Sequence, residues 1–486
     1  MALMDPATWT DRIYSGGWVT PAGGSYPVVE PATGEELGRL GLADAEDVKR
    51  ATARAASAQP EWARTSYEER ARVLRRAADL WQEHADELQR WIIRESGGIP
   101  PKAQLETHVA ANECYEAAAL PSHPYGRLLP SAQERFSFAR RLPSGVVGVI
   151  APFNFPVILS IRSVAPALAL GNAVVLKPDP RTAVCGGVSL AAVFEEAGLP
   201  DGVLHVLPGG AEIGQALVTD PHVRTVAFTG NSATGRTVAE LGGRHLKRVH
   251  LELGGNSALV VLDDADLDRA ASAGAWASFL HQGQICMTTG RHLVHERLHD
   301  RYLAMLAEKA DHLPVGNPAT EQVALGPIID QRQRDRVHEL VTASVDAGAR
   351  LAAGGSYEGL FYRPTVLGEV TTEMPAYAKE VFGPVAPVLS FSTLDEAARL
   401  AADSEYGLSL AILTRDVMKA LDLAARIPSG AVHINDQTVQ DEAHIPFGGV
   451  GISGTGVRLG GSEANIDAFT ETQWVTIRGE IAPYPF

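Results

Sequence analysis

Short strands rich in Val, Ile and Leu, alternating with helical segments, constrain this chain more than any other feature. In the first half of the chain the strand-like segments are residues 145–150, 173–176, 203–207, 225–228 and 248–251. Strands that are apolar on both faces and joined by helices are typical of a parallel sheet covered by helices on both sides. Ligands of such a sheet bind at the carboxyl ends of its strands.

A second series of the same kind begins after Gly254 and Gly255. Its strand-like segments are residues 258–262, 291–295, 385–389, 408–413 and 431–435. A chain of 486 residues is also too long for one ordinary core and favours two or three domains. The sequence therefore predicts an α/β fold with two parallel-sheet domains.

The segments that precede the first series differ from it. Residues 9–40 are rich in turn-forming residues and predict an N-terminal arm laid over the body. Apolar residues at three- and four-residue spacing predict two long amphipathic helices across residues 44–94 and a third across 104–119.

Two further segments, residues 126–142 and 468–486, alternate polar and aromatic residues. This pattern predicts exposed strands, and we expect the two segments to share one extra sheet. Exposed strands that carry Phe often pair with a second subunit, so the pattern favours a homo-oligomer.

Composition excludes several classes of protein. The net charge of -16, with no basic cluster, argues against nucleic acid and anionic membranes as partners. No apolar run is long enough for a membrane span, and the first residues lack a signal-peptide pattern. Three cysteines, Cys114, Cys185 and Cys286, form no disulfide framework. A soluble protein of the reducing cytoplasm fits best.

Cys286 is the candidate nucleophile. It follows Gly283 closely, after an alanine-rich helical run that ends at Ser278. A thiolate is the reactive form, and we expect nearby helix ends or hydrogen-bond donors to lower the pKa of this thiol. The alternative is that Cys286 is a small buried apolar residue, as most cysteines are.

Two polar residues stand at strand ends where they would serve a nucleophile. Glu252 lies between two leucines, and burial there would raise the pKa of its carboxyl as a general base requires; the alternative is a salt-bridged Glu. Asn154 lies between Phe153 and Phe155. Its side-chain N–H would stabilise an oxyanion, a contribution of about 3 kcal/mol.

Other motifs are weaker signals. Lys177, before Pro178, ends a strand and would point into the ligand crevice, although a solvated surface lysine is the alternative. Residues 228–235 lead from a strand into a helix whose N-terminus would suit a pyrophosphate, or are an ordinary turn. The loops 380–384 and 446–449 are by themselves consistent with simple turns.

Taken together, these motifs resemble the aldehyde dehydrogenase superfamily. They are Pro152-Phe153-Asn154-Phe155-Pro156, Leu176-Lys177-Pro178, Phe228-Thr229-Gly230, Leu251-Glu252-Leu253-Gly254-Gly255, Gly283-Gln284-Ile285-Cys286, Glu380-Val381-Phe382-Gly383-Pro384 and Pro446-Phe447-Gly448-Gly449, in the family's order over nearly the whole chain. Segments such as Phe279-Leu280-His281-Gln282-Gly283-Gln284 and His433-Ile434-Asn435-Asp436-Gln437 are most similar to bacterial benzaldehyde dehydrogenases.

The resemblance implies a mechanism. Cys286 attacks the aldehyde carbon, while Asn154 and the Cys286 backbone N–H hold the oxyanion. After hydride passes to a nicotinamide, Glu252 activates the water that releases a carboxylic acid. No metal is implied.

The resemblance also implies a cofactor site. Lys177 and Glu380 bind the two riboses, Phe382 packs near the nicotinamide, and Gly230 to Gly235 lie under the pyrophosphate. The implied set of cofactor-binding residues is Pro152, Phe153, Lys177, Gly230, Asn231, Ser232, Gly235, Glu380 and Phe382.

Two residues depart from the family's pattern at this site. Asn231 stands where the family more often has Ser. Pro180 stands where strictly NAD-dependent relatives often have a Glu that binds the 2'-hydroxyl. NAD is therefore the expected cofactor, with NADP left open.

The substrate site is implied less sharply. Phe155, Leu159, Ile285, Met287 and Phe447 would form an apolar slot for a flat ring. Arg162, on the same helix face as Phe155 and Leu159, would favour a ring with a polar substituent, unless it forms a structural ion pair. Benzaldehyde, salicylaldehyde and vanillin all remain open, as does a broad range of aldehydes.

Two alternatives to an acid-forming dehydrogenase remain. In a CoA-acylating dehydrogenase of the same fold a thiol would replace water, but Glu252 would then have no hydrolytic role. An inert binding protein of the same fold would not need Cys286, Glu252, Asn154 and Lys177 together.

The resemblance finally divides the chain into parts. Residues 1–120 and 143–254 are expected to form the dinucleotide-binding domain, and residues 255–453 the catalytic domain. Residues 121–142 and 454–486 are expected to form a small β oligomerisation arm, giving a homodimer or homotetramer.

Overall fold

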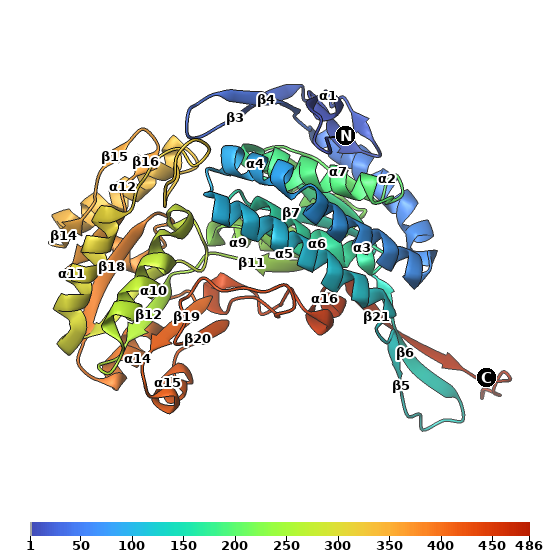
Figure 1. The fold of residues 1–486 in the computed structure, drawn as a ribbon. Coiled ribbons are helices and arrows are strands. Elements are labelled where there is room, and N and C mark those ends of the chain that lie inside the picture. Colours follow the sequence, from blue (N-terminus) through green and yellow to red (C-terminus); the bar gives the residue numbers. More distant parts are fainter. Residues whose placement is uncertain (1) are drawn as a thin grey trace.

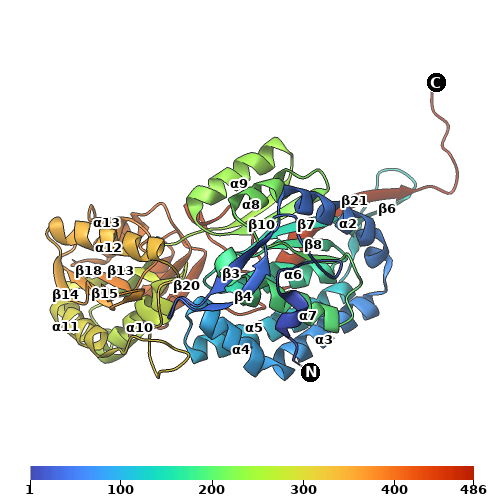
Figure 2. The same cartoon turned by 90° about the horizontal axis from the view of Figure 1, so that it is seen from above.

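The computed structural model describes residues 2–486, which form two seven-stranded sheets in separate halves of the molecule (Figures 1 and 2). The strand order of the first sheet is β11-β10-β7-β8-β9-β1-β2. Five of its strands run parallel, and they are the five that the sequence pattern predicted. Their bounds are β7 (Val146–Ile150), β8 (Ala173–Lys177), β9 (Leu204–Val206), β10 (Val223–Thr229) and β11 (Arg248–Glu252).

The N-terminal segment is only partly the arm that the sequence predicted. β1 (Ile13–Ser15) pairs antiparallel with β9 and so extends the first sheet, together with β2 (Trp18–Val19). α1 (Pro6–Trp9) precedes them, and the hairpin of β3 (Ser25–Val29) and β4 (Glu36–Gly41) lies across the body (Figure 1).

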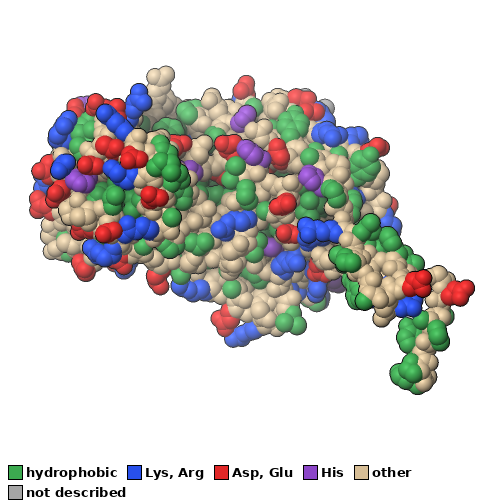
Figure 3. Space-filling view, turned by 90° about the horizontal axis from the view of Figure 1, so that it is seen from below, with side chains coloured by type: hydrophobic (Ala, Val, Ile, Leu, Met, Phe, Trp, Pro, Cys, Tyr) green, Lys and Arg blue, Asp and Glu red, His purple; other side chains and the backbone are tan. Residues whose placement is uncertain are grey.

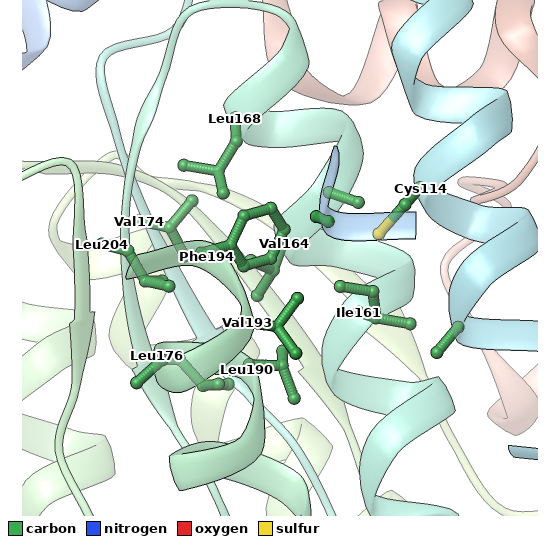
Figure 4. Packing of buried hydrophobic residues seen from close by; sticks show 14 of the residues in the cluster. Cys114, Ile161, Val164, Leu168, Val174, Leu176, Leu190, Val193, Phe194 and Leu204 are labelled. Atoms are coloured by element: carbon green, nitrogen blue, oxygen red, sulfur yellow. The ribbon is translucent and has the colours of Figure 1, made fainter. Parts of the chain in front are cut away.

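Helices cover both faces of the first sheet because its strands are apolar on both faces. Val175 packs with α2 and α8, whereas its neighbours Val174 and Leu176 pack with α6 and α7 on the opposite face. Figure 4 shows Val174, Leu176 and Leu204 close to Phe194 of α7 and Leu168 of α6. The helices are α2 (Ala45–Arg64), α3 (Tyr67–Glu83), α4 (Ala85–Ser96), α5 (Pro100–Ala119), α6 (Pro156–Ala169), α7 (Ser189–Glu196), α8 (Ala211–Thr219) and α9 (Ser232–Arg244).

The prediction of two helices across residues 44–94 is wrong, because three helices occupy this stretch. Helix α2 ends before Thr65. The Ser66 side chain then caps α3 by accepting a hydrogen bond from the Glu69 N–H. His84 separates α3 from α4. The next helix, α5, begins four residues earlier than predicted, since Pro100 and Pro101 fit the first turn of a helix.

The second sheet has the strand order β14-β17-β18-β13-β12-β19-β20. Its five predicted strands are present and parallel. Two short strands, β14 and β17, were not predicted. The bounds are β12 (Ser257–Val261), β13 (Thr289–His295), β14 (Arg350–Ala353), β17 (Thr365–Gly368), β18 (Val385–Phe391), β19 (Ser409–Leu413) and β20 (Ala431–Ile434).

Helices also cover both faces of this second sheet. Leu259 and Val261 pack with α10 and α11, whereas Ala258 and Val260 pack with α12, α14 and α15. The helices are α10 (Leu267–Phe279), α11 (Glu296–His312), α12 (Gln331–Asp346), α13 (Pro375–Ala378), α14 (Leu394–Ala402) and α15 (Val417–Ala424), and a small hairpin is formed by β15 (Tyr357–Glu358) and β16 (Phe361–Tyr362).

The third sheet confirms that the two polar-aromatic segments pair. β21 (Thr470–Ile477), which follows α16 (Ser462–Phe469), pairs antiparallel with β6 (Phe136–Pro143), and β6 pairs with β5 (Gly126–Leu128). This arm projects from the body (Figure 1), and exposed apolar side chains cover part of it (Figure 3). The boundaries predicted for the two domains and the arm remain predictions.

Within residues 2–486, no helix is both long and apolar enough to cross a membrane. The same residues contain no group of three or more His, Cys, Asp or Glu side chains that could hold a metal ion.

Candidate active site

A tight turn positions Cys286 after the end of α10. His281 and Gln282 have φ angles of 48° and 57°, and Gly283 follows with 65°. This left-handed backbone is unfavourable for residues with a Cβ, so the surrounding structure must hold it. Gln282 does so by donating from Nε2 to the carbonyls of Gly97 (3.1 Å) and Pro327 (2.7 Å).

Cys286 is the one cysteine of the three that is not fully buried. Cys114 and Cys185 are at most 1% exposed and lie in the core of the first half; Figure 4 shows Cys114 facing Ile161 of α6. Exposure therefore separates the candidate nucleophile from the two packing cysteines.

The structure brings Asn154 to the same turn. Asn154 lies between β7 and α6, is 3% exposed, and donates from Nδ2 to the Gln284 carbonyl at 2.9 Å. A buried amide bonded to the residue two positions before the nucleophile can donate to an oxygen that develops negative charge on the attacked carbon.

Glu252 is the last residue of β11. Its carboxyl is buried, and within residues 2–486 one of its two oxygens has no hydrogen-bond partner. Its Oε2 has no hydrogen-bond partner among the described residues. Gly448 lies so close that a Cβ there would be 2.7 Å from Glu252 Oε1. Burial raises the pKa of this carboxyl well above its ordinary value, although the charges of Arg162 and Arg458 oppose the shift. A carboxyl of this kind is suited to accept a proton from water near neutral pH.

We expected nearby helix ends or hydrogen-bond donors to lower the pKa of the Cys286 thiol. For the free protein this expectation was wrong. Burial, together with the carboxylates of Glu380, Glu252 and Asp441, raises the pKa of the thiol to about 12. The backbone N–H of Met287 opposes this shift only weakly. In the free protein, Cys286 is therefore mostly a neutral thiol.

We expect this raised pKa to be measurable by alkylation of the free protein with iodoacetamide. Only the thiolate reacts, so the rate at Cys286 should keep rising with pH up to pH 10 or beyond. Mass spectrometry of peptides should find Cys114 and Cys185 unmodified in the folded protein, because both are buried. A rate that reaches its plateau near pH 7 would contradict the burial argument.

Two of the predicted cofactor residues are ionisable groups with unused hydrogen-bonding capacity: Lys177 is buried and Glu380 is partly exposed. Lys177 Nζ ends β8 and donates only to the Pro178 carbonyl, at 3.1 Å. Burial lowers its pKa. The Glu380 carboxylate accepts from the Gly255 N–H at 3.0 Å and has its pKa raised to about 7 by burial. A Lys donor and a Glu acceptor of this kind match the hydroxyls of a ribose.

The predicted aromatic residues of the cofactor site lie together. The rings of Phe153 and Phe382 meet edge to face at 5.9 Å, and the Arg181 guanidinium lies 4.2 Å from the centre of the Phe153 ring. Phe382 itself has a φ of 55°, in the left-handed region that residues with a Cβ rarely adopt. Pro152 precedes this group at the end of β7.

Residues 228–235 form the turn from β10 to α9. Asn231 caps α9 by accepting from the Thr234 N–H, and Ser232 Oγ donates to the Ile452 carbonyl at 3.0 Å. Gly235 allows close packing, since a Cβ there would lie 2.4 Å from Leu253. The side chains of Asn231 and Ser232 are thus engaged in the protein, and the helix N-terminus itself remains the candidate for binding phosphate.

The predicted apolar slot is one packed cluster around the nucleophile. Phe155, Ile285, Met287 and Phe447 are its buried members that the sequence indicated, and Leu159 and Cys286 pack against it. The sequence missed Val109, Ile158, Leu280, Leu408 and Val439. Ile158 could have been found by helical spacing from Phe155, but Val109 comes from α5, which carried no motif.

Arg162 is not a free cation. It is 3% exposed, and its guanidinium pairs with Glu113 at 3.0 Å and with Asp441 at 2.5 Å. The structural ion pair, which the sequence left open, is therefore present. The guanidinium still lies 5.6 Å from the centre of the Phe447 ring, so this charged group borders the apolar cluster.

A buried carboxylate that the sequence did not indicate supports the start of α6. Glu106 Oε2 accepts from the N–H groups of Val157 (2.9 Å) and Ile158 (3.3 Å), while its other oxygen pairs with Lys102. The N-cap residue of α6, Phe155, provides no side-chain cap of its own. Glu106 therefore fixes the helix end directly after Asn154.

The chain is similar to several known proteins. The model of the aldehyde dehydrogenase family matches residues 18–475. A vanillin dehydrogenase of Amycolatopsis sp. is 69% identical over 486 residues, covering 100% of both chains. An NAD(+) benzaldehyde dehydrogenase of Pseudomonas putida is 49% identical over 98% of both.

Among solved structures, a salicylaldehyde dehydrogenase from Pseudomonas putida G7, complexed with salicylaldehyde, superposes with a TM-score of 0.94. It is 35% identical and covers 98% of this chain, which covers 99% of that one. With the family model matched over nearly its whole length, this chain belongs to the aldehyde dehydrogenase family.

Proposed function

We propose that this protein oxidises an aromatic aldehyde to the carboxylic acid, with NAD+ as the hydride acceptor, through a covalent bond to Cys286. The observation that carries the proposal is the convergence of an accessible thiol, the Asn154 amide and the buried Glu252 carboxyl beside an apolar cluster. The names of the vanillin, benzaldehyde and salicylaldehyde dehydrogenases to which the chain is similar support an aromatic substrate.

The first half of the reaction uses Cys286 and Asn154. The thiol gives up its proton to solvent, the sulfur attacks the aldehyde carbon, and the carbonyl oxygen becomes an oxyanion held by Asn154 Nδ2 and the Cys286 N–H. NAD+, when bound, supplies the hydride acceptor and a cationic ring whose charge favours the thiolate. Loss of hydride from the adduct leaves a thioester on Cys286.

The second half uses Glu252. Its carboxylate removes a proton from water, and the resulting hydroxide attacks the thioester carbon. The carbon–sulfur bond then breaks, which releases the acid and restores the thiol. The pKa of Glu252, raised by burial, makes it a stronger base than an exposed Glu.

The cofactor would be bound by residues described above. Lys177 Nζ has two N–H donors to spare and Glu380 has free acceptor capacity, which fits two riboses; the α9 N-terminus fits the pyrophosphate. The position of Pro180 provides no carboxylate against a 2'-phosphate, so NADP stays a second candidate.

We expect Asn154→Ala to lower the rate of acid formation about 10²- to 10³-fold, because it removes a buried oxyanion donor. Steady-state kinetics with benzaldehyde would show the loss mainly in kcat, since the amide acts on the transition state. Turnover close to the parent rate would mean that another donor holds the oxyanion.

The proposed function is tested by steady-state kinetics with NAD+ and a panel of aldehydes. We expect kcat/KM for benzaldehyde, salicylaldehyde and vanillin to exceed that for a linear aliphatic aldehyde, with the acid as product. A preference for the aliphatic aldehyde would contradict the aromatic substrate. A requirement for added CoA, with an acyl-CoA product, would favour the CoA-acylating alternative.

We also propose that the protein is a cytoplasmic homodimer or homotetramer that assembles through the arm. Three unpaired cysteines suit a reducing compartment. The arm exposes several large apolar side chains that a second copy would cover: Leu128, Leu129, Phe136, Trp474 and Ile477.

The assembly predicts that Leu128→Glu will shift the protein toward smaller species in size-exclusion chromatography with light scattering. Leu128 is 73% exposed, so a charge there would be harmless in a monomer and costly inside an interface. Met418→Glu, at a residue 66% exposed on α15, is the matched control and should change nothing. An unchanged mass for Leu128→Glu would place the interface elsewhere.

A further inference from the structure

A largely buried group of three charges, formed by Glu113, Arg162 and Asp441, lies one helical turn beyond the apolar cluster. Arg162 follows Ile158 by four residues on α6, and Glu113 follows Val109 by four residues on α5. Residues at this spacing share a helix face. Because Ile158 and Val109 both pack in the cluster with Cys286, the charges border the end of that cluster.

The guanidinium nitrogens of Arg162 are all hydrogen-bonded to groups within the protein. Its Nε donates to Glu113 Oε1 at 3.0 Å, its Nη1 pairs with Asp441 Oδ2 at 2.5 Å, and its Nη2 donates to the Glu442 carbonyl at 3.4 Å. Each guanidinium nitrogen therefore has an acceptor. Arg162 holds its partners in place and is not the group that meets a substrate.

Asp441 has the unused capacity in this group. Its Oδ2 binds Arg162, whereas its Oδ1 is buried and has no hydrogen-bond partner among the described residues. The side chain as a whole is 19% exposed. A buried carboxylate oxygen without a hydrogen-bond partner in the protein is a position where a donor from a ligand would be favourable.

Asp441 also belongs to the environment of the reacting groups. Its charge acts on both Cys286 and Glu252 and raises the pKa of each. Val439, two residues before it, and Phe447, six residues after it, are both part of the apolar cluster. The segment that carries Asp441 therefore forms one side of the place where the proposed ring would lie.

We infer that Asp441 Oδ1 accepts a hydrogen bond from a ring hydroxyl of the substrate, which makes hydroxybenzaldehydes with the hydroxyl remote from the aldehyde the preferred class. The inference rests on the proposed function. A hydroxyl at position 3 or 4 points away from the sulfur and toward the charged group, whereas a hydroxyl at position 2 stays beside the carbonyl.

The charge balance of the group supports the same class. Two carboxyl groups surround one guanidinium, so the group favours donors over acceptors. A neutral hydroxyl donates to a carboxylate in a charge-assisted hydrogen bond. A carboxylate substituent on the ring would meet the same charge as its own and would be rejected.

The test compares kcat/KM for 4-hydroxybenzaldehyde and 4-methylbenzaldehyde, at a pH where the phenol is protonated. The two substituents are similar in size, and only the hydroxyl donates a hydrogen bond. Electron release by the hydroxyl slows attack on the carbonyl, so a preference for it reports binding. In the parent enzyme we expect the hydroxyl compound to be favoured by roughly tenfold or more.

Variants of Asp441 test whether this residue causes the preference for the hydroxyl compound. Asp441→Ala should bring the ratio of the two kcat/KM values close to one, and Asp441→Asn, which keeps an oxygen acceptor without the charge, should give a ratio in between. Glu442→Gln removes the neighbouring exposed charge and should retain the parent ratio. If Asp441→Ala does not fold, the ratios of the two kcat/KM values for the parent enzyme and for Asp441→Asn still test the inference.

The outcomes separate the inference from the proposed function. A parent ratio near one, or a ratio unchanged in Asp441→Ala, would overturn the role of Asp441 while both aldehydes are still oxidised. Failure to oxidise either aldehyde with NAD+ or NADP would instead overturn the proposed function.

Discussion

Replacing Cys286 by alanine is expected to abolish acid formation, with a loss of kcat on the order of 10⁴-fold or more. Every proposed step forms or breaks a bond to this sulfur, and the two other cysteines are buried away from the cluster. NADH formation with benzaldehyde, followed by absorbance, measures the loss. Binding of NAD+ should persist, because the predicted cofactor residues lie on other segments.

Cys114→Ala and Cys185→Ala are the matched controls. Both residues are buried core cysteines, so their loss should change stability more than turnover. Residual turnover of the Cys286→Ala variant within tenfold of the parent would contradict covalent catalysis.

Replacing Glu252 by glutamine is expected to separate the two halves of the reaction. Hydride transfer should still give a burst of one NADH per active site, followed by a steady state slower by about 10²- to 10⁴-fold. The burst should survive because removing the Glu252 charge lowers, and does not raise, the pKa of Cys286. Stopped-flow absorbance resolves the two phases.

A matched variant tests whether the Glu252 effect is specific. Glu471→Gln removes an exposed carboxylate on the arm and should leave both phases unchanged. If Glu252→Gln turned over at the parent rate with no burst, another group would have to activate the water.

Local patterns predicted most of the fold because each strand carries its own signal. The ten segments of the two series each show an apolar run between turns. β14 and β17 were missed because β14 has only one apolar residue other than alanine and the apolar run of β17 is only Val366-Leu367. The break at Thr65 was predictable in principle, since Ser66 followed by Glu69 is a helix-start pattern.

The candidate site was predicted less completely, because its environment comes from distant parts of the chain. Arg162 was placed on the right helix face, but its partners are 49 and 279 residues away, and no local pattern indicates them. The carboxylates that raise the pKa of Cys286 are likewise remote in sequence. The motifs therefore indicated which site residues come together. Only the structure showed which charged residues surround them and how deeply they are buried.

The most direct test of covalent capture is the mass of the Glu252→Gln variant after mixing with NAD+ and benzaldehyde. Because hydrolysis is slow in this variant, the thioester should accumulate. We predict that intact-protein mass spectrometry will find one added benzoyl group, and that peptide analysis will place it on Cys286. An unmodified protein that nevertheless forms NADH, or a benzoyl group on another residue, would contradict the mechanism.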